Sequence, residues 1–171
     1  MYQVVVFLHL LAAVVWIGGM VFLALVAIPP LRRLPDPQRA ALVTAMGVRF
    51  RIVGWIAIAV LITTGILNLA YRGVSWEAVA TGRLWETPFG RILAWKLAFV
   101  GAMIVLSVLH DFIIGPASAR LAQPGQAGAP SPPDRQALAL RRAAAWIGRL
   151  NLLLALAVLL LAVTLVRGLP H

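Results

Sequence analysis

Long apolar runs recur along the chain and are interrupted only by isolated polar side chains. Crossing the ~30 Å hydrocarbon layer of a bilayer takes about 20 apolar residues in helical conformation, and four runs reach that length. Lipid offers no hydrogen-bond partner to backbone N–H and C=O groups, so each run is expected to form a helix rather than a strand. The runs cover approximately residues 2–28, 50–71, 88–115 and 142–166.

Polar residues at the ends of these runs extend two of the predicted helices beyond the bilayer. Asp36 stands before Pro37, and Asp134 follows a pair of prolines, an arrangement typical of a helix N-terminus. Thr87 before Pro88 caps the third helix in the same way. The segment 117–133, rich in Pro, Gly and Ala, predicts a flexible cytoplasmic linker. We therefore expect a single transmembrane domain over 1–171, with helices at about 2–28, 37–71, 88–115 and 135–168.

Composition and charge narrow the class of protein. With 62% hydrophobic and 12% charged residues and a mean hydropathy of +0.95, the chain cannot bury its apolar groups in one water-soluble core. We predict an all-α integral membrane protein, an up-down four-helix bundle in a lipid bilayer. The basic residues that give the net charge of +10 flank the spans. Nucleic-acid binding is not expected, because no basic stripe is interleaved with aromatic residues. The lack of cysteine excludes disulfides, thiolate metal sites and iron–sulfur clusters.

The distribution of arginine predicts the orientation, because positive residues near span ends stay on the cytoplasmic side. The connections between the first and second runs and between the third and fourth carry most of the arginines. The opposite side carries fewer, and it also holds Glu77 and Glu86. Both termini are therefore predicted outside the cytoplasm, in a bacterial-type inner (plasma) membrane. The residues assigned to the cytoplasmic side are Arg32, Arg33, Arg39, Arg49, Arg51, Arg120, Arg135, Arg141, Arg142 and Arg149.

Polar side chains inside the spans cost free energy in lipid, so each is a candidate for function. In an up-down bundle, early residues of the first and third helices lie level with late residues of the second. His9, Lys96 and Asn68 thus share a layer near the predicted outer face, and Arg72 follows Asn68 by one turn on the same side. Trp16 lies on the same stripe as His9, seven residues later. These five residues are the predicted cofactor-binding group.

Further candidates continue toward the predicted cytoplasmic end of the third helix. Lys96, Met103 and His110 repeat every seven residues and so form one stripe, and both methionine and histidine can ligate copper. With His9, Met103 and His110 are the predicted metal ligands. A second polar cluster near that end comprises Arg51, His110, Asp111, Arg149 and Asn151.

Less specific explanations stay open for the same residues. Lys96 lies about 12 Å into its helix, within reach of snorkelling to the headgroups. His9 can donate to a backbone carbonyl of a neighbouring helix, and Met103 can fill a packing gap. The inner cluster has the composition of a cytoplasmic rim, in which Asp111 pairs with an arginine. Against these stands one coincidence: the single lysine of the chain and one of its three histidines lie level, on faces expected to point inward.

A meeting of His9 and Lys96 in a dry interior would support two kinds of chemistry. A neutral imidazole is a ligand for copper or for haem iron. A lysine amine can carry a proton or pair with an anionic group such as a haem propionate. These residues leave the choice between copper and haem b open.

Three segments together resemble the CopD family, the copper resistance protein D domain. They are Leu8–Met20, Arg49–Arg51 leading to Leu61–Asn68, and Thr87–Leu97. Their order and spacing carry the likeness over about three of the four helices. The resemblance implies copper handling at the inner membrane, by passage from periplasm to cytoplasm or by tolerance. Larger CopD proteins have more spans, so a homo-oligomer or a membrane partner protein is expected to complete a transport path.

The layout is also similar to that of the HemJ-type membrane protoporphyrinogen oxidases, which have four helices. In that group an early histidine and a third-span lysine are the residues expected to matter, and His9 and Lys96 match them in position. This likeness implies haem or porphyrin chemistry, and redox enzyme activity is expected only in that case.

The residues and the two likenesses support three hypotheses of function. In the first, His9 receives copper near the outer surface with help from Asn68 and Lys96, and Met103 and His110 are inward steps. In the second, His9 is an axial ligand of haem b, and Lys96 or the arginines meet its propionates. In the third, the chain is a scaffold subunit of a membrane complex and needs no site.

Overall fold

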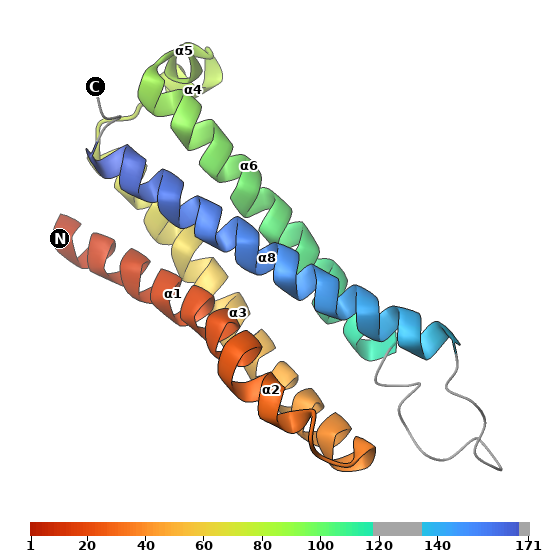
Figure 1. The fold of residues 1–171 in the computed structure, drawn as a ribbon. Coiled ribbons are helices and arrows are strands. Elements are labelled where there is room, and N and C mark those ends of the chain that lie inside the picture. Colours follow the sequence, from red (N-terminus) through yellow and green to blue (C-terminus); the bar gives the residue numbers. More distant parts are fainter. Residues whose placement is uncertain (118–134, 168–171) are drawn as a thin grey trace. The chain divides into compact units, whose positions relative to one another are not determined.

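The computed structural model describes residues 1–117 and 135–167 (Figure 1). Within them, four helices are long and apolar enough to cross a membrane, and no strand is present. The predicted all-α membrane fold is therefore confirmed, and the protein is a multi-pass membrane protein; its orientation stays a prediction. The predicted linker over 117–133 lies outside the described residues except for Ala117, which is helical. The four spans are Tyr2–Leu31, Pro37–Tyr71, Pro88–Ala117 and Leu138–Leu165.

Large apolar side chains are exposed along all four spans. One example from each span is Val14, Ile56, Val105 and Leu160, and the exposed fraction of Val14 is 68%. Exposing such side chains to water costs about 25 cal/mol per Å² of apolar surface. Lipid tails are as apolar as the side chains themselves, so in a bilayer the same surface carries no such cost. This exposure is what a protein with lipid as its solvent requires.

The first span is a continuous rod made of α1 (Tyr2–Phe22), the π-helical segment η1 (Leu23–Ala27) and α2 (Ile28–Leu31). Pro29 and Pro30 lack the N–H groups that carbonyls four residues earlier would accept, and their rings clash with those carbonyls. These carbonyls belong to η1, so its wider turn accommodates the two prolines without ending the span.

The second long helix, α3 (Asp36–Tyr71), has 36 residues. At 1.5 Å per residue it is about 54 Å long, so it reaches beyond the ~30 Å hydrocarbon layer. It ends in a glycine cap: Gly73, with φ +75°, donates its N–H to the Ala70 carbonyl, and the Val74 N–H bonds the Leu69 carbonyl at 3.1 Å. These two bonds satisfy carbonyls of the last turn and redirect the chain sharply.

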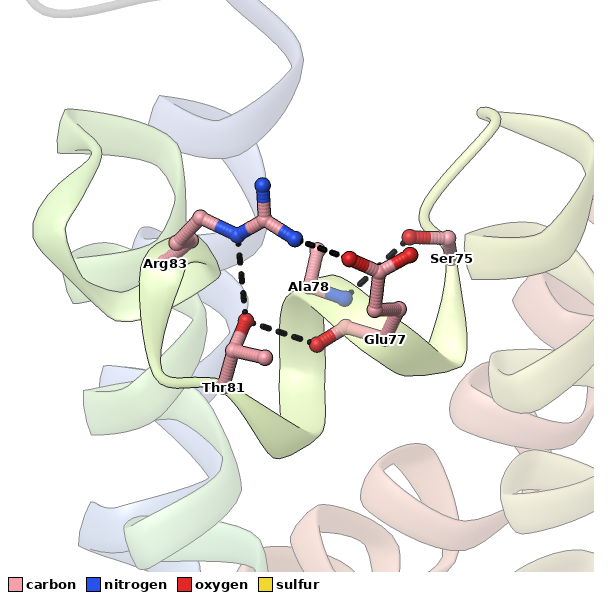
Figure 2. A network of polar contacts seen from close by, with 5 residues as sticks. All are labelled: Ser75, Glu77, Ala78, Thr81 and Arg83. Atoms are coloured by element: carbon pink, nitrogen blue, oxygen red, sulfur yellow. Dashed lines mark hydrogen bonds and ion pairs between the residues drawn. The ribbon is translucent and has the colours of Figure 1, made fainter.

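The connection that follows α3 contains an exposed polar network (Figure 2). The helix α4 (Trp76–Ala80) is capped by Ser75, whose hydroxyl accepts a backbone N–H of the first turn. Arg83 forms an ion pair with Glu77 and also donates through Nε to the Thr81 hydroxyl at 3.1 Å. The Thr81 hydroxyl donates in turn to the Glu77 carbonyl at 2.8 Å. The network folds this connection back on itself.

Threonine and glycine then join α5 (Arg83–Glu86) to α6 (Pro88–Val108). The Thr87 hydroxyl donates to the Leu84 carbonyl at 2.7 Å and accepts the Gly90 N–H at 2.9 Å. The predicted Thr87 cap is therefore confirmed. A Cβ on Gly90 would overlap the Leu84 carbonyl, so glycine is needed where the short helix meets the start of α6.

The remaining helices complete two compact units. After α6 comes the π-helical segment η2 (Leu109–Ile114), and α8 covers Arg135–Arg167. The first unit comprises residues 1–97 with the described chain from Leu159 onward, and the second comprises Ala98–Val158. In the first unit, α1 lies alongside α3 (Figure 1).

Small residues let α1 and α3 approach each other closely. A Cβ on Gly54 would lie 3.6 Å from the Trp16 ring, and a Cβ on Gly65 would lie 3.6 Å from Cε1 of His9. Association of helices in lipid depends on such close packing because no hydrophobic force drives it there. The buried apolar residues of this pair of helices are Ala12, Trp16, Ile17, Ala57 and Ile58.

Candidate functional site

The His9 imidazole is held between α1 and α3. Its Nδ1 lies 2.8 Å from the hydroxyl oxygen of Thr64, a residue only 5% exposed. The Gly65 backbone leaves room for the imidazole to lie against α3. His9 therefore bonds a neighbouring helix as expected, but its partner is a side-chain hydroxyl and not the backbone carbonyl that was predicted.

The Thr64 hydroxyl has a second short contact, with its own helix. Its oxygen lies 2.6 Å from the carbonyl oxygen of Val60 and 3.4 Å from that of Leu61. A hydroxyl that bonds the carbonyl four residues earlier is common in apolar helices because it satisfies the group locally. In this protein the same oxygen also meets an imidazole from another helix, so the two spans are joined by a chain of hydrogen bonds.

Lys96, at the end of the first unit, is electrostatically coupled to this region. Its ammonium group lies within electrostatic range of the His9 ring and of the Arg72 guanidinium. Arg72 also stacks over the Phe89 ring, 5.7 Å from its centroid, a cation–π contact. Neither cation forms an ion pair with a carboxylate in the part of the chain that the structure describes. Within the described residues, the site therefore has two basic side chains and no carboxylate paired with either.

Asn68 and Trp16 are the other two members of the predicted cofactor-binding group. The Oδ1 atom of Asn68 is buried and, among the described residues, has no hydrogen-bond partner. An unsatisfied buried acceptor costs about 1–3 kcal/mol, so this oxygen would gain from a bound donor or cation. Trp16 is buried in the contact between α1 and α3, with its indole ring against Gly54.

Met103 and His110, the other predicted metal ligands, lie in the second unit. Met103 is 1% exposed. The Nδ1 atom of His110 lies 3.0 Å from a carboxylate oxygen of Asp111, the next residue. Over residues 1–117 and 135–167, no group of three His, Cys, Asp or Glu side chains is placed to hold a metal ion.

The second unit contains its own polar contact between helices. The Nδ2 atom of Asn151 on α8 donates to the Ser107 hydroxyl on α6 at 3.2 Å. Nearby along α8, the Arg149 guanidinium lies 5.3 Å from the centroid of the Trp146 ring. These contacts involve two members of the predicted inner cluster, Arg149 and Asn151.

Thr64 is the residue of this region that the sequence argument missed. One signal was available: Thr64 precedes Asn68 by four residues, so the two share a face of α3. The signal is weak, because a threonine in an apolar helix is usually satisfied by its own backbone. Its importance comes from His9, which is 55 residues away in the chain.

Four apolar spans and an imidazole hydrogen-bonded inside one of them define a polytopic membrane protein with a candidate ligand site among its helices. The sequence model of the family described as copper resistance protein D, CopD, matches residues 44–165. The chain therefore belongs to the CopD family, as the three segments predicted. Thr64, Asn68 and Lys96 lie within the matched segment, whereas His9 and Trp16 precede it.

A similar protein is known from Aquifex aeolicus (strain VF5), where it is described as uncharacterized. It is 29% identical to this chain over 116 residues, which cover 67% of the chain and 71% of the relative. No solved structure matches the chain.

Proposed function

We propose that the protein handles copper in the membrane and that His9 is the residue that receives the ion. Membership of the CopD family supports copper as the cargo. The observation that supports His9 is its 2.8 Å hydrogen bond to the buried Thr64 hydroxyl. Metal-ligating histidines usually have one ring nitrogen held by such a partner, which orients the other nitrogen toward the metal. Copper accepts imidazole nitrogen readily.

Asn68 and Lys96 are proposed to assist at the same place. The buried Oδ1 of Asn68, which lacks a partner within the described chain, can accept a donor from a bound group. Wherever Lys96 and Arg72 are protonated, they oppose the entry of a bare copper ion, because like charges repel strongly in a medium of low dielectric constant. We therefore expect copper to reach His9 together with an anionic ligand that these cations attract.

Met103 and His110 are proposed as later positions on an inward path. Thioether sulfur and imidazole nitrogen are the soft and intermediate ligands that suit Cu(I). With both termini outside the cytoplasm, His9 would face the periplasmic side and copper would pass from there toward the cytoplasm. A homo-oligomer or a membrane partner protein would supply the rest of a complete path.

Copper titration tests the first part of this proposal. Purified, metal-free protein in nanodiscs would be titrated with Cu(I) and Cu(II) against a chromophoric chelator. We expect one equivalent bound per chain, lost in His9→Ala and retained in Ser107→Ala, which removes a hydroxyl from the second unit. His110→Ala should keep this first equivalent. The proposal fails if the wild-type chain binds no stoichiometric copper, or if His9→Ala binds it unchanged.

A b-type haem or porphyrin is the alternative ligand, and one observation favours it. Lys96 lies within electrostatic range of both His9 and Arg72, and neither basic side chain is paired with a carboxylate in the described residues, so haem propionates would find cationic partners there. In this alternative His9 would be an axial ligand, and redox activity would come from the bound group. The visible spectrum of the purified protein distinguishes the two hypotheses. A Soret band that disappears in His9→Ala would show that haem, and not copper, is the ligand of His9.

A further inference from the structure

We infer that Thr64 is a positioning residue that selects the tautomer of His9, with the proton on Nδ1 and the free lone pair on Nε2. This inference rests on the proposed function in one respect, because it names the atom through which His9 would bind copper. The tautomer itself is a property of the metal-free protein, and it can be measured without any ligand.

The argument begins with the single hydrogen of the Thr64 hydroxyl. The oxygen lies 2.6 Å from the Val60 carbonyl oxygen and 2.8 Å from Nδ1 of His9, both ordinary hydrogen-bond distances. A carbonyl oxygen can only accept, so the bond to Val60 uses the hydroxyl hydrogen. The remaining contact needs a hydrogen from the other side. Both bonds form together only if Nδ1–H of His9 donates to the threonine oxygen.

Burial gives this arrangement its strength. Thr64 is 5% exposed and lies within an apolar span, so its hydroxyl has little access to water and depends on protein partners. In the other tautomer Nδ1 carries no proton, so both Nδ1 and the Val60 carbonyl would need the single hydrogen of the Thr64 hydroxyl. One of these two acceptors would then stay unsatisfied.

The consequence for ligand binding concerns the other ring nitrogen. In a neutral imidazole only one nitrogen carries a proton, so a proton on Nδ1 leaves the lone pair of Nε2 available. Cε1 of the ring lies close to Gly65, 3.6 Å from where a Cβ would stand, while Nδ1 meets Thr64. We therefore assign Nε2 as the ligating atom, and Thr64 as the partner that orients it.

Nitrogen NMR of the metal-free protein tests the tautomer. The chain would be labelled with ¹⁵N-histidine, reconstituted in nanodiscs at a pH where the ring is neutral, and His9 assigned by its loss in His9→Gln. We expect wild type and Thr64→Ser to show a protonated Nδ1, and Thr64→Val to show a mixture of tautomers. Thr63→Val is the matched control, because the Thr63 hydroxyl is exposed and donates to a carbonyl of its own helix, that of Ala59, at 3.0 Å.

Copper affinity gives a second reading on the same variants. Loss of a partner that orients a metal-ligating histidine typically lowers metal affinity about 10–100-fold. Thr64→Val should therefore lower the affinity for copper by that factor. Thr64→Ser and Thr63→Val should bind as wild type does. A protonated Nε2 in the wild-type spectrum, or an unchanged spectrum in Thr64→Val, would overturn the inference whatever the copper result. A protonated Nδ1 in a chain that binds no copper would support the inference and reject the proposed function.

Discussion

Each compact unit contains a hydrogen bond that joins two helices inside the spans, and these two bonds differ in what they leave available. In the first unit, Nδ1 of His9 meets the Thr64 hydroxyl at 2.8 Å. In the second, Nδ2 of Asn151 donates to the Ser107 hydroxyl at 3.2 Å. Each bond has one partner that is buried, Thr64 or Asn151. Only the imidazole keeps a nitrogen that can ligate a transition metal.

The comparison shows that burial alone does not identify a site in a membrane protein. Every polar group in a span is costly and attracts attention as a functional candidate. The Asn151 amide meets part of that cost through its Nδ2 bond to the Ser107 hydroxyl, and an amide and a hydroxyl offer only weak ligands to a soft metal such as Cu(I). A histidine held by one nitrogen satisfies the cost and still has a ligand to offer. A buried polar side chain that still has an atom able to bind a ligand is therefore better evidence of a site than burial alone.

The largest expected effect is a difference in copper affinity between variants that remove one or the other of these two bonds. His9→Ala removes the proposed ligand itself, so its affinity should fall by on the order of 100-fold or more, beyond the loss of an orienting partner alone. Asn151→Ala should leave the affinity unchanged. Chelator competition on both purified variants measures this. Equal losses in the two variants would remove the distinction between the bonds.

A smaller loss is expected when the ring of His9 is displaced and its chemistry is kept. A Cβ at position 65 would already lie 3.6 Å from Cε1 of the imidazole, so we expect the longer side chain of Gly65→Leu to push the ring away from Thr64. We expect copper affinity to fall about 10-fold, as for the loss of an orienting partner. Gly65→Ala, which makes ordinary van der Waals contact, should bind normally.

Gly101→Leu is the matched control for this displacement, because nothing lies within 4 Å of a Cβ at that position. It adds the same side chain to an apolar span without touching the ring. If Gly101→Leu weakened copper as much as Gly65→Leu, the effect would come from general disturbance of the helices and not from the position of His9.

Loss of the hydrogen bond in the second unit should lower the stability of the protein and leave its copper affinity unchanged. Hydrogen bonds between membrane helices contribute about 0.6 kcal/mol on average and up to about 1.7 kcal/mol. Ser107→Ala should therefore lower the free energy of unfolding by about that amount, measured by reversible unfolding in micelles. Thr64→Val should show a loss of stability of similar size together with weaker copper binding. A copper defect in Ser107→Ala would contradict the assignment of a purely structural role.

The smallest effect is expected at the exposed network between α3 and α6, a polar contact outside the spans. The side chains of Arg83 and Glu77 are 64% and 73% exposed, so their ion pair is screened by water and salt. Glu77→Gln should change the free energy of unfolding by about 0.5 kcal/mol or less, and high salt should abolish the difference. A larger change would show that this connection is shielded from solvent in the membrane-bound protein.

Several features of the molecule follow from short stretches of sequence. The four helices could be predicted because a span needs only a long apolar run, and the Thr87 cap because its partners lie within three residues. The expected layer of His9, Asn68 and Lys96 rested on depth within each span. The structure places Lys96 within electrostatic range of His9, while the functional roles of these residues stay predictions.

The partner of His9 could not be predicted in the same way. Thr64 looks like any threonine that bonds its own backbone, and nothing within one turn of it points to an imidazole. The contact depends on how α1 is aligned along α3, which glycines such as Gly65 permit by letting the helices approach.

Local chemistry decided that this chain enters lipid as apolar helices, because length and hydropathy act on each segment separately. The tertiary arrangement alone decided which hydroxyl meets the imidazole, and hence which nitrogen is left to bind a ligand. A hydrogen bond between two helices requires a register between them that is set by the packing of many side chains together. His9 marks a possible ligand in the sequence; its pairing with Thr64 determines which way that ligand is presented.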